Sequence, residues 1–139
     1  MVTPFRVLEH TADVGFEAFG RSREEAFANA ARALMHLIVE PETLKERESA
    51  EIRVEGSTPP DLLVNWLSEI LYLHETERLL FRDFEIHHLD EHSILATGRG
   101  EKFDPARHRI KLQVKAITYH QLGLEPTAEG WRAQVYVDL

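Results

Sequence analysis

The sequence predicts an α+β fold in which a mainly antiparallel sheet is packed by two long helices. Two stretches place apolar residues at helical spacing behind a helix-capping signal. Several shorter stretches alternate apolar and polar residues, which is typical of strands with one buried face. We expect residues 1–139 to form a single domain, because the chain has no repeat, linker or low-complexity segment.

The chain opens with two predicted strands, at residues 5–8 and 14–19, joined by a polar turn that lies ahead of Gly15. This turn carries His10 and Asp13 three residues apart. A turn between strands can present such side chains to a ligand on a rigid frame. The alternative is local: Asp13 hydrogen-bonds amides of the turn, and Gly15 only permits an unusual backbone angle.

Both helices begin with a recognisable cap. Ser22 is followed three residues later by Glu25, which forms a capping box, and Pro41 ends the helix. The buried stripe of this helix is predicted to consist of Phe27, Ala30, Ala31, Leu34, Leu37 and Ile38. The second helix is predicted from Thr58, with a proline at the first helical position, to about Glu77. Its apolar face, which we expect to pack on the sheet, consists of Leu63, Trp66, Leu67, Ile70 and Leu73.

The rest of the chain is predicted to alternate between strands and loops. The expected strands are 51–55, a strand that begins at Phe84, 93–100, 110–116 and 131–138. The expected loops and turns are 40–50, 90–91, 100–105 and the glycine-rich region 123–130.

Composition limits the classes of function. The formal net charge is −8, with 24 acidic and 16 scattered basic residues, so tight direct binding to RNA or DNA is not expected. An acidic face suits a metal ion or a basic protein partner instead. No run approaches the roughly 20 apolar residues of a membrane span. Without cysteine there is no disulfide and no thiolate metal site, and residues 1–6 lack the pattern of a signal peptide, so we expect a cytoplasmic protein.

The histidines do not form a predicted metal site. His87, His88 and His92 lie near a probable hairpin, where strand alternation points the first two to opposite faces, so we interpret them as surface residues. His74 follows the apolar stripe of the second helix and is interpreted as structural, whereas His120 has no assignment. The motifs of P-loop NTPases, zinc proteases and serine hydrolases are absent.

Asp138 and Leu139 are better metal candidates. The Asp138 side chain and the terminal carboxylate of Leu139 place hard oxygen donors side by side, which suits Mg²⁺, Mn²⁺ or Ca²⁺. If the first and last strands are neighbours, Asp13 adds a third carboxylate. The alternative is a solvated acidic strand end. Lys115 projects from the polar side of its strand, where it would pair with these carboxylates or receive a phosphate, unless it is a plain surface lysine.

These residues belong to blocks by which the chain resembles the archease family. The blocks span almost the whole sequence in order: Glu9–Gly15, Leu62–Leu67 with Glu69–Tyr72, Gly100-Glu101, Val114–His120 and the closing Asp138-Leu139. The last residue is Leu where Ile is expected in relatives, which matters little if its backbone carboxylate is the ligand.

The resemblance implies a compact α+β domain of the SHS2-like type, with a metal site formed by Asp13, Asp138 and the carboxylate of Leu139. It also implies an activator of an RtcB-type RNA ligase, the enzyme that joins 2′,3′-cyclic phosphate or 3′-phosphate ends to 5′-hydroxyl ends in tRNA splicing and RNA repair. That ligase first forms a GMP–histidine adduct from GTP with Mn²⁺. The family is expected to promote this guanylylation and multiple turnover without being the ligase.

The leading hypothesis is therefore a non-enzymatic accessory protein. In it, the carboxylates position a divalent ion near the ligase's nucleotide site, Lys115 steadies a phosphate or a ligase carboxylate, and His10 braces its turn. The alternative is a stand-alone metal-dependent phosphoesterase or nucleotide hydrolase, although no general base stands out. The sequence leaves open the bound ion, the docking surface, the oligomeric state and a role toward other RNA-modifying enzymes.

Overall fold

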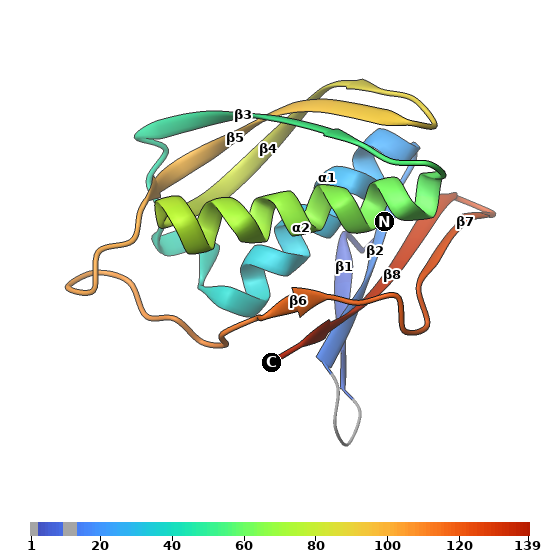
Figure 1. Ribbon diagram of the computed structural model, residues 1–139. Coiled ribbons are helices and arrows are strands. Elements are labelled where there is room, and N and C mark those ends of the chain that lie inside the picture. Colours follow the sequence, from blue (N-terminus) through green and yellow to red (C-terminus); the bar gives the residue numbers. More distant parts are fainter. Residues whose placement is uncertain (1–2, 10–13) are drawn as a thin grey trace.

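The computed structural model describes residues 3–9 and 14–139, so the predictions for His10 and Asp13 lie outside the described residues. The chain forms two antiparallel sheets with two helices between them (Figure 1). The helices are α1 (Arg23–Ile38) and α2 (Pro59–Glu77). Each helix contacts strands of both sheets, so the two helices form the middle layer of the molecule.

The five-stranded sheet has the order β1-β2-β8-β6, and β7 also pairs with β8. Its strands are β1 (Phe5–Glu9), β2 (Val14–Gly20), β6 (Ala116–Ile117), β7 (Gly123–Thr127) and β8 (Gly130–Asp138). The three-stranded sheet has the order β3-β5-β4. Its strands are β3 (Glu48–Glu55), β4 (Leu79–Leu89) and β5 (Ser93–Lys102).

The predicted α+β class is confirmed, but the strands form two sheets, not one, and cover the helices from two sides. The sequences of the two helices explain this arrangement. Ala28, Ala33 and Met35 of α1 are buried although they lie off the predicted stripe. Leu62 and Leu71 of α2 are buried in the same way. A helix that is apolar around most of its circumference needs partners on more than one side.

The predicted starts of both helices are confirmed. The Ser22 hydroxyl accepts a hydrogen bond from the Glu25 amide at 3.1 Å, and the Thr58 hydroxyl accepts one from the Asp61 amide at 3.3 Å. These bonds satisfy amides that the first turn of a helix leaves without partners. The second helix ends at Glu77, followed by Arg78 in the left-handed conformation (φ 62°).

Trp66 joins the middle layer to the three-stranded sheet. Its side chain is fully buried, and its indole N–H donates to the carbonyl oxygen of Phe27 on α1 at 2.9 Å. Its ring meets Phe84 of β4 edge-on, with 5.8 Å between centroids. Burial of a large aromatic ring with its polar atom satisfied is a strong local contribution to the core.

Several predicted strand boundaries are wrong. The strand expected from Phe84 begins at Leu79, because Leu79–Phe81 are all buried and show no alternation. β3 begins at Glu48 and β5 continues to Lys102, so both run into segments expected to be loops. Gly100 lets β5 come close to β4, since a Cβ there would lie 1.9 Å from the Leu80 carbonyl oxygen.

The segment 103–115 is irregular, and of the strand expected at 110–116 only Ala116 lies in a strand, the two-residue β6. Its alternating apolar residues instead pack on the core individually: Val114 is buried, and Ile110 and Leu112 are partly buried. The region 123–130, expected to be a turn, contributes β7. Among the described residues, no helix is long and apolar enough to cross a membrane.

Candidate functional site

The pairing of β2 with β8 determines which residues meet at the candidate metal site. Val14, which follows Asp13 in the sequence, pairs with Val137, which precedes Asp138. On the other edge of β8, Ala116 of β6 pairs with Asp138. Figure 1 shows the end of β8, in dark red, next to β6. Asp138 therefore lies between the start of β2 and the short strand that follows Lys115.

Asp138 has the properties that a metal ligand needs. Its side chain is exposed, and its carboxylate has no hydrogen bond or ion pair with any other described residue. Leu139 follows it directly and is 48% exposed. A carboxylate that no protein cation neutralises is available to a hard divalent ion. The donor chemistry of the described residues therefore fits the predicted site, whose third member, Asp13, lies outside them.

Lys115 lies beside Asp138 along the backbone, where its amide donates to the Asp138 carbonyl oxygen at 2.8 Å. Lys115 also lines a cavity together with Arg78 and Phe103. No ion pair joins the Lys115 ammonium to the Asp138 carboxylate in the described part of the chain. The lysine is thus close to the strand end without neutralising it.

The three hairpin histidines lie on β4 and the turn that follows it, in the other sheet, and have separate partners. His87 contacts the Thr97 hydroxyl at 2.8 Å, and His88 contacts the Asp90 carboxylate at 2.9 Å. His92 lies 3.4 Å from the Gly56 carbonyl oxygen. No group of three metal-ligating side chains occurs within residues 3–9 and 14–139. The interpretation of the three hairpin histidines as surface residues is confirmed by their exposure.

His74 is partly buried, as expected of a structural residue, and one ring nitrogen lies 3.1 Å from the Leu79 carbonyl oxygen. Burial lowers the pKa of its imidazole, and the hydrogen bond to Leu79 opposes this only in part. A neutral ring bonded to the strand after α2 stabilises the end of that helix.

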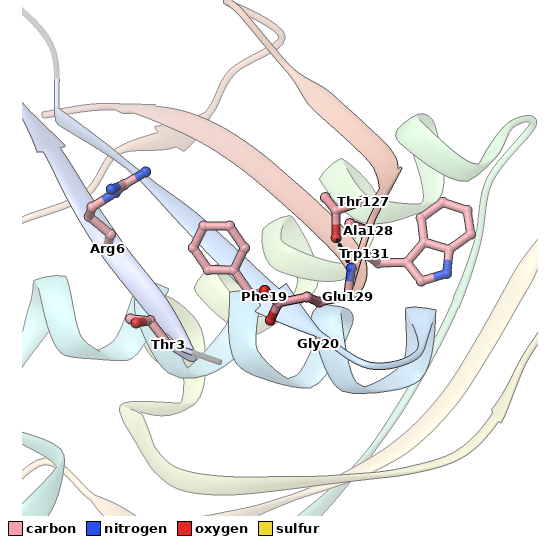
Figure 2. Close-up of a pocket in the computed structure, with 8 residues that line it drawn as sticks. All are labelled: Thr3, Arg6, Phe19, Gly20, Thr127, Ala128, Glu129 and Trp131. Carbon is pink, nitrogen blue, oxygen red and sulfur yellow. Dashed lines mark hydrogen bonds between the residues drawn. The ribbon is translucent and has the colours of Figure 1, made fainter. Parts of the chain in front are cut away.

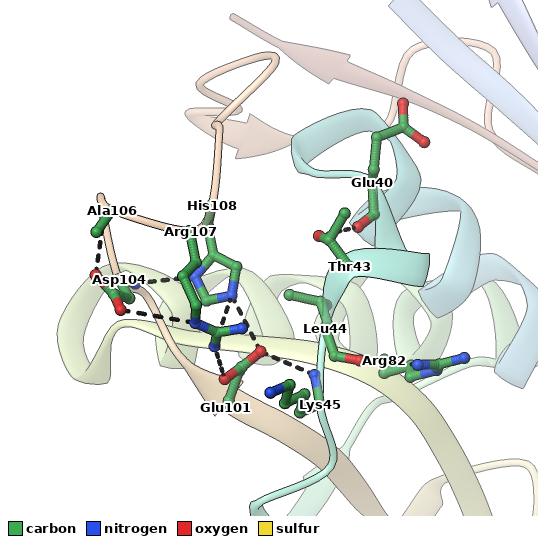
Figure 3. A network of polar contacts seen from close by, with 10 residues as sticks. All are labelled: Glu40, Thr43, Leu44, Lys45, Arg82, Glu101, Asp104, Ala106, Arg107 and His108. Atoms are coloured by element: carbon green, nitrogen blue, oxygen red, sulfur yellow. Dashed lines mark hydrogen bonds and ion pairs between the residues drawn. The ribbon is translucent and has the colours of Figure 1, made fainter.

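A buried polar network, which the sequence did not predict, lies around Glu101 (Figure 3). Glu101 is 4% exposed, and one of its oxygens accepts from the Lys45 amide at 2.8 Å and contacts His108 at 3.0 Å. Its other oxygen pairs with Arg107. The Asp104 amide donates to Nδ1 of His108 at 2.9 Å, so the proton of the neutral ring is on Nε2, which donates to Glu101.

This network sets the ionisation of Glu101 and the course of the chain. Burial alone would raise the pKa of Glu101, but the Lys45 amide, His108 and the charge of Arg107 outweigh it and lower the pKa to about 2. The bonds hold the beginning of segment 103–115 against β5, and that segment leads to Lys115. The only signal in the sequence is Glu101, Arg107 and His108 within eight residues, and nothing local shows that they meet.

A second pocket, of about 370 Å³, lies near the start of β8, at the other end of that strand from Asp138 (Figure 2). Phe19, Trp131 and Arg6 line it. The Arg6 guanidinium is already paired with Glu17, a buried carboxylate that also pairs with Arg132. Because the Arg6 guanidinium is matched by Glu17, it is not available to an anion in this pocket.

Comparisons with known proteins agree with this fold. The model of the Archease protein family (MTH1598/TM1083) matches residues 5–139. Proteins named archease from Methanosarcina mazei and Pyrococcus abyssi are 42% and 43% identical to this chain. These alignments cover 97% and 94% of this chain, respectively, and 95% of each relative.

Two solved structures resemble this protein. The solution structure of protein 1598 from Methanobacterium thermoautotrophicum has a TM-score of 0.83 at 31% identity, covering 98% of this chain and 99% of that one. A crystal structure from Thermotoga maritima, described as an archease and possible chaperone, has a TM-score of 0.62 at 23% identity, covering 100% of this chain and 98% of that one. The second likeness concerns the fold alone.

Proposed function

The chain belongs to the archease protein family, and we propose that it is an accessory protein that activates an RtcB-type RNA ligase. In this role it promotes the GTP- and metal-dependent guanylylation of the ligase and its multiple turnover, and it performs no turnover of its own. Family membership supports the accessory role. The observation that carries the site is the register that joins the start of β2 to the end of β8.

The proposed metal ligands are Asp13, Asp138 and the carboxylate of Leu139. Val14 pairs with Val137, and paired Cα atoms of antiparallel strands lie about 4.5–5.5 Å apart. Asp13 and Asp138 are each one residue from this pair in the sequence, and in the proposal both bind the same ion, whose oxygen ligands lie at roughly 2.0–2.6 Å. When bound, Mn²⁺, Mg²⁺ or Ca²⁺ would supply positive charge to phosphate oxygens.

Electrostatics favours a transient complex with the ligase. A partner that holds GTP, RNA and metal needs a basic, phosphate-binding cleft, and this chain has a net charge of −8. Charge complementarity of this kind speeds association and selects the orientation of the partners. A small interface allows the complex to separate after each activation. In this arrangement His10 braces the turn beside the metal site and Lys115 contacts a phosphate or a ligase carboxylate.

The test is a ligation assay with a cognate ligase, GTP, Mn²⁺ and RNA ends bearing 3′-phosphate and 5′-hydroxyl groups. The wild-type protein should raise the number of ligations per ligase molecule well above one. The Asp13→Ala and Asp138→Ala variants should lose this effect while remaining folded. Glu91→Ala is a matched control, because Glu91 is an exposed acidic residue in the turn between β4 and β5.

Full stimulation by the Asp138→Ala variant would contradict the proposed site. No stimulation by the wild-type protein would contradict the accessory role. Release of phosphate from GTP or RNA by this protein alone would favour the phosphoesterase or nucleotide hydrolase.

A further inference from the structure

The cavity that contains Lys115 lies between the end of α2 and segment 103–115 and has a volume of about 390 Å³. Arg78, Phe103, Glu75 and Gln113 also line it. Ligand pockets in proteins commonly have volumes of about 300–1,000 Å³ and combine apolar walls with a few polar groups. This cavity has both features.

The cavity has two cations without a carboxylate partner. The Arg78 guanidinium lies over the Phe103 ring, 5.2 Å from its centroid, and it has no ion pair within the described residues. The Lys115 ammonium has none either. By contrast, Arg32 and Arg99 are each paired with a carboxylate on a strand. Against the single carboxylate of Glu75 in the same lining, these two cations leave the cavity with an excess of positive charge, which suits an anion.

The position of Arg78 is set by the fold. It follows the last residue of α2 in the left-handed conformation, and its carbonyl oxygen accepts from the Phe103 amide at 2.7 Å. This bond ties the end of the helix to the beginning of segment 103–115. The guanidinium is therefore held on the aromatic wall, where a planar group with several donors can bind two oxygens of one anion.

The cavity is connected to the candidate metal site through the backbone of Lys115, whose amide donates to the Asp138 carbonyl oxygen. Sites that hold Mg²⁺ typically combine one or two carboxylates with phosphate oxygens of the ligand. A phosphate bound by Lys115 would be held by a residue whose backbone is hydrogen-bonded directly to Asp138. This arrangement favours a phosphate over a carboxylate as the anion.

We propose that this cavity binds the phosphates of a nucleoside triphosphate, with Arg78 and Lys115 as the phosphate contacts. Glu75 and Gln113 line the same cavity and offer hydrogen-bonding groups to the nucleoside. An RNA 3′-phosphate has the same anionic group, but the net charge of −8 disfavours a longer polyanion. This inference rests on the proposed function only for its connection to the metal site.

The test is calorimetric titration of the full chain with pyrophosphate and with GTP, both in EDTA. Both should bind, and the Arg78→Gln and Lys115→Gln variants should each weaken binding about tenfold, the effect of losing one charge-assisted contact. The matched control is Arg109→Gln, because Arg109 is an exposed residue of the same segment that does not line the cavity. It should bind as the wild type does. Arg78→Lys, which keeps the positive charge, should retain part of the affinity.

Absence of pyrophosphate binding to the wild type, or equal binding by a folded Arg78→Gln variant, would overturn the proposal. Displacement of pyrophosphate by an oligonucleotide with a 3′-phosphate, but not by GTP, would also overturn it and assign the cavity to RNA ends. Because these titrations use neither metal nor ligase, failure here leaves the ligation assay unaffected. Absence of ligase stimulation, in turn, would not contradict pyrophosphate binding measured by calorimetry.

Discussion

Glu101 is a buried residue whose charge the fold stabilises. Its carboxylate is buried, but the Lys45 amide, His108 and Arg107 favour its ionised form. Its pKa falls from 4.5 to about 2 on folding. Because the folded pKa lies below the unfolded one, the stabilisation is complete above pH 4.5 and is lost as the pH falls toward 2.

We therefore expect the Glu101→Gln variant to lose about 2 kcal/mol of unfolding free energy at neutral pH, the contribution of hydrogen bonds to a charged group. The difference from the wild type should shrink as the pH falls from 4.5 toward 2. Denaturant unfolding at a series of pH values measures the loss of unfolding free energy and its change with pH. The Glu91→Gln variant should show neither effect. A difference that stays constant over this pH range would contradict the assignment.

At the same scale, the sequence predicts some residues of the proposed site and gives no signal for other polar contacts near it. Asp138 and Lys115 were named because strand alternation and position in the chain are visible in a sequence. The contact of Glu101 with His108 was not predicted, because it depends on the path of an irregular segment. That Lys115 lines a cavity was not predicted either, because segment 103–115 is not a strand and strand alternation does not apply to it.

Among the elements, the close approach of β4 and β5 makes the clearest prediction. A Cβ on Gly100 would lie 1.9 Å from the Leu80 carbonyl oxygen, whereas a Cβ on Gly123 of β7 would have no atom nearer than 3.7 Å. Gly100→Ala should therefore cost about 3 kcal/mol of unfolding free energy, the upper end for overpacking. Gly123→Ala, the control, should stay within about 0.5 kcal/mol. Equal thermal stability of the two variants would contradict this account of the strand pairing.

The starts of both helices were predicted to the residue because capping side chains are local signals, whereas α1 ends at Ile38, three residues before the predicted stop at Pro41. The strands were predicted less well. Leu79–Phe81 are buried without alternation, and the apolar residues of 110–114 alternate without pairing to a strand. Burial and backbone pairing are separate properties, and alternation in a sequence reports only the first.

For the whole molecule, the two sheets were not predicted because their existence depends on how many sides of each helix are covered. Once they form, β8 is an interior strand of the five-stranded sheet, with β2 on one side and β6 and β7 on the other. This order brings the start of β2 and the residue after Lys115 to the end of β8. The proposed metal site is thus a consequence of topology, and the net charge of −8 suits its proposed basic partner.

Paramagnetic broadening of amide NMR signals by Mn²⁺ tests this central claim most directly. We predict that substoichiometric Mn²⁺ broadens the signals of Val14, Ala116 and Asp138 first, and leaves those of His88 and His92 unchanged. The Asp13→Asn and Asp138→Asn variants should lose the broadening, and Glu91→Gln should retain it. Broadening centred on the turn between β4 and β5, or unchanged in the Asp138→Asn variant, would contradict a metal site at the end of β8.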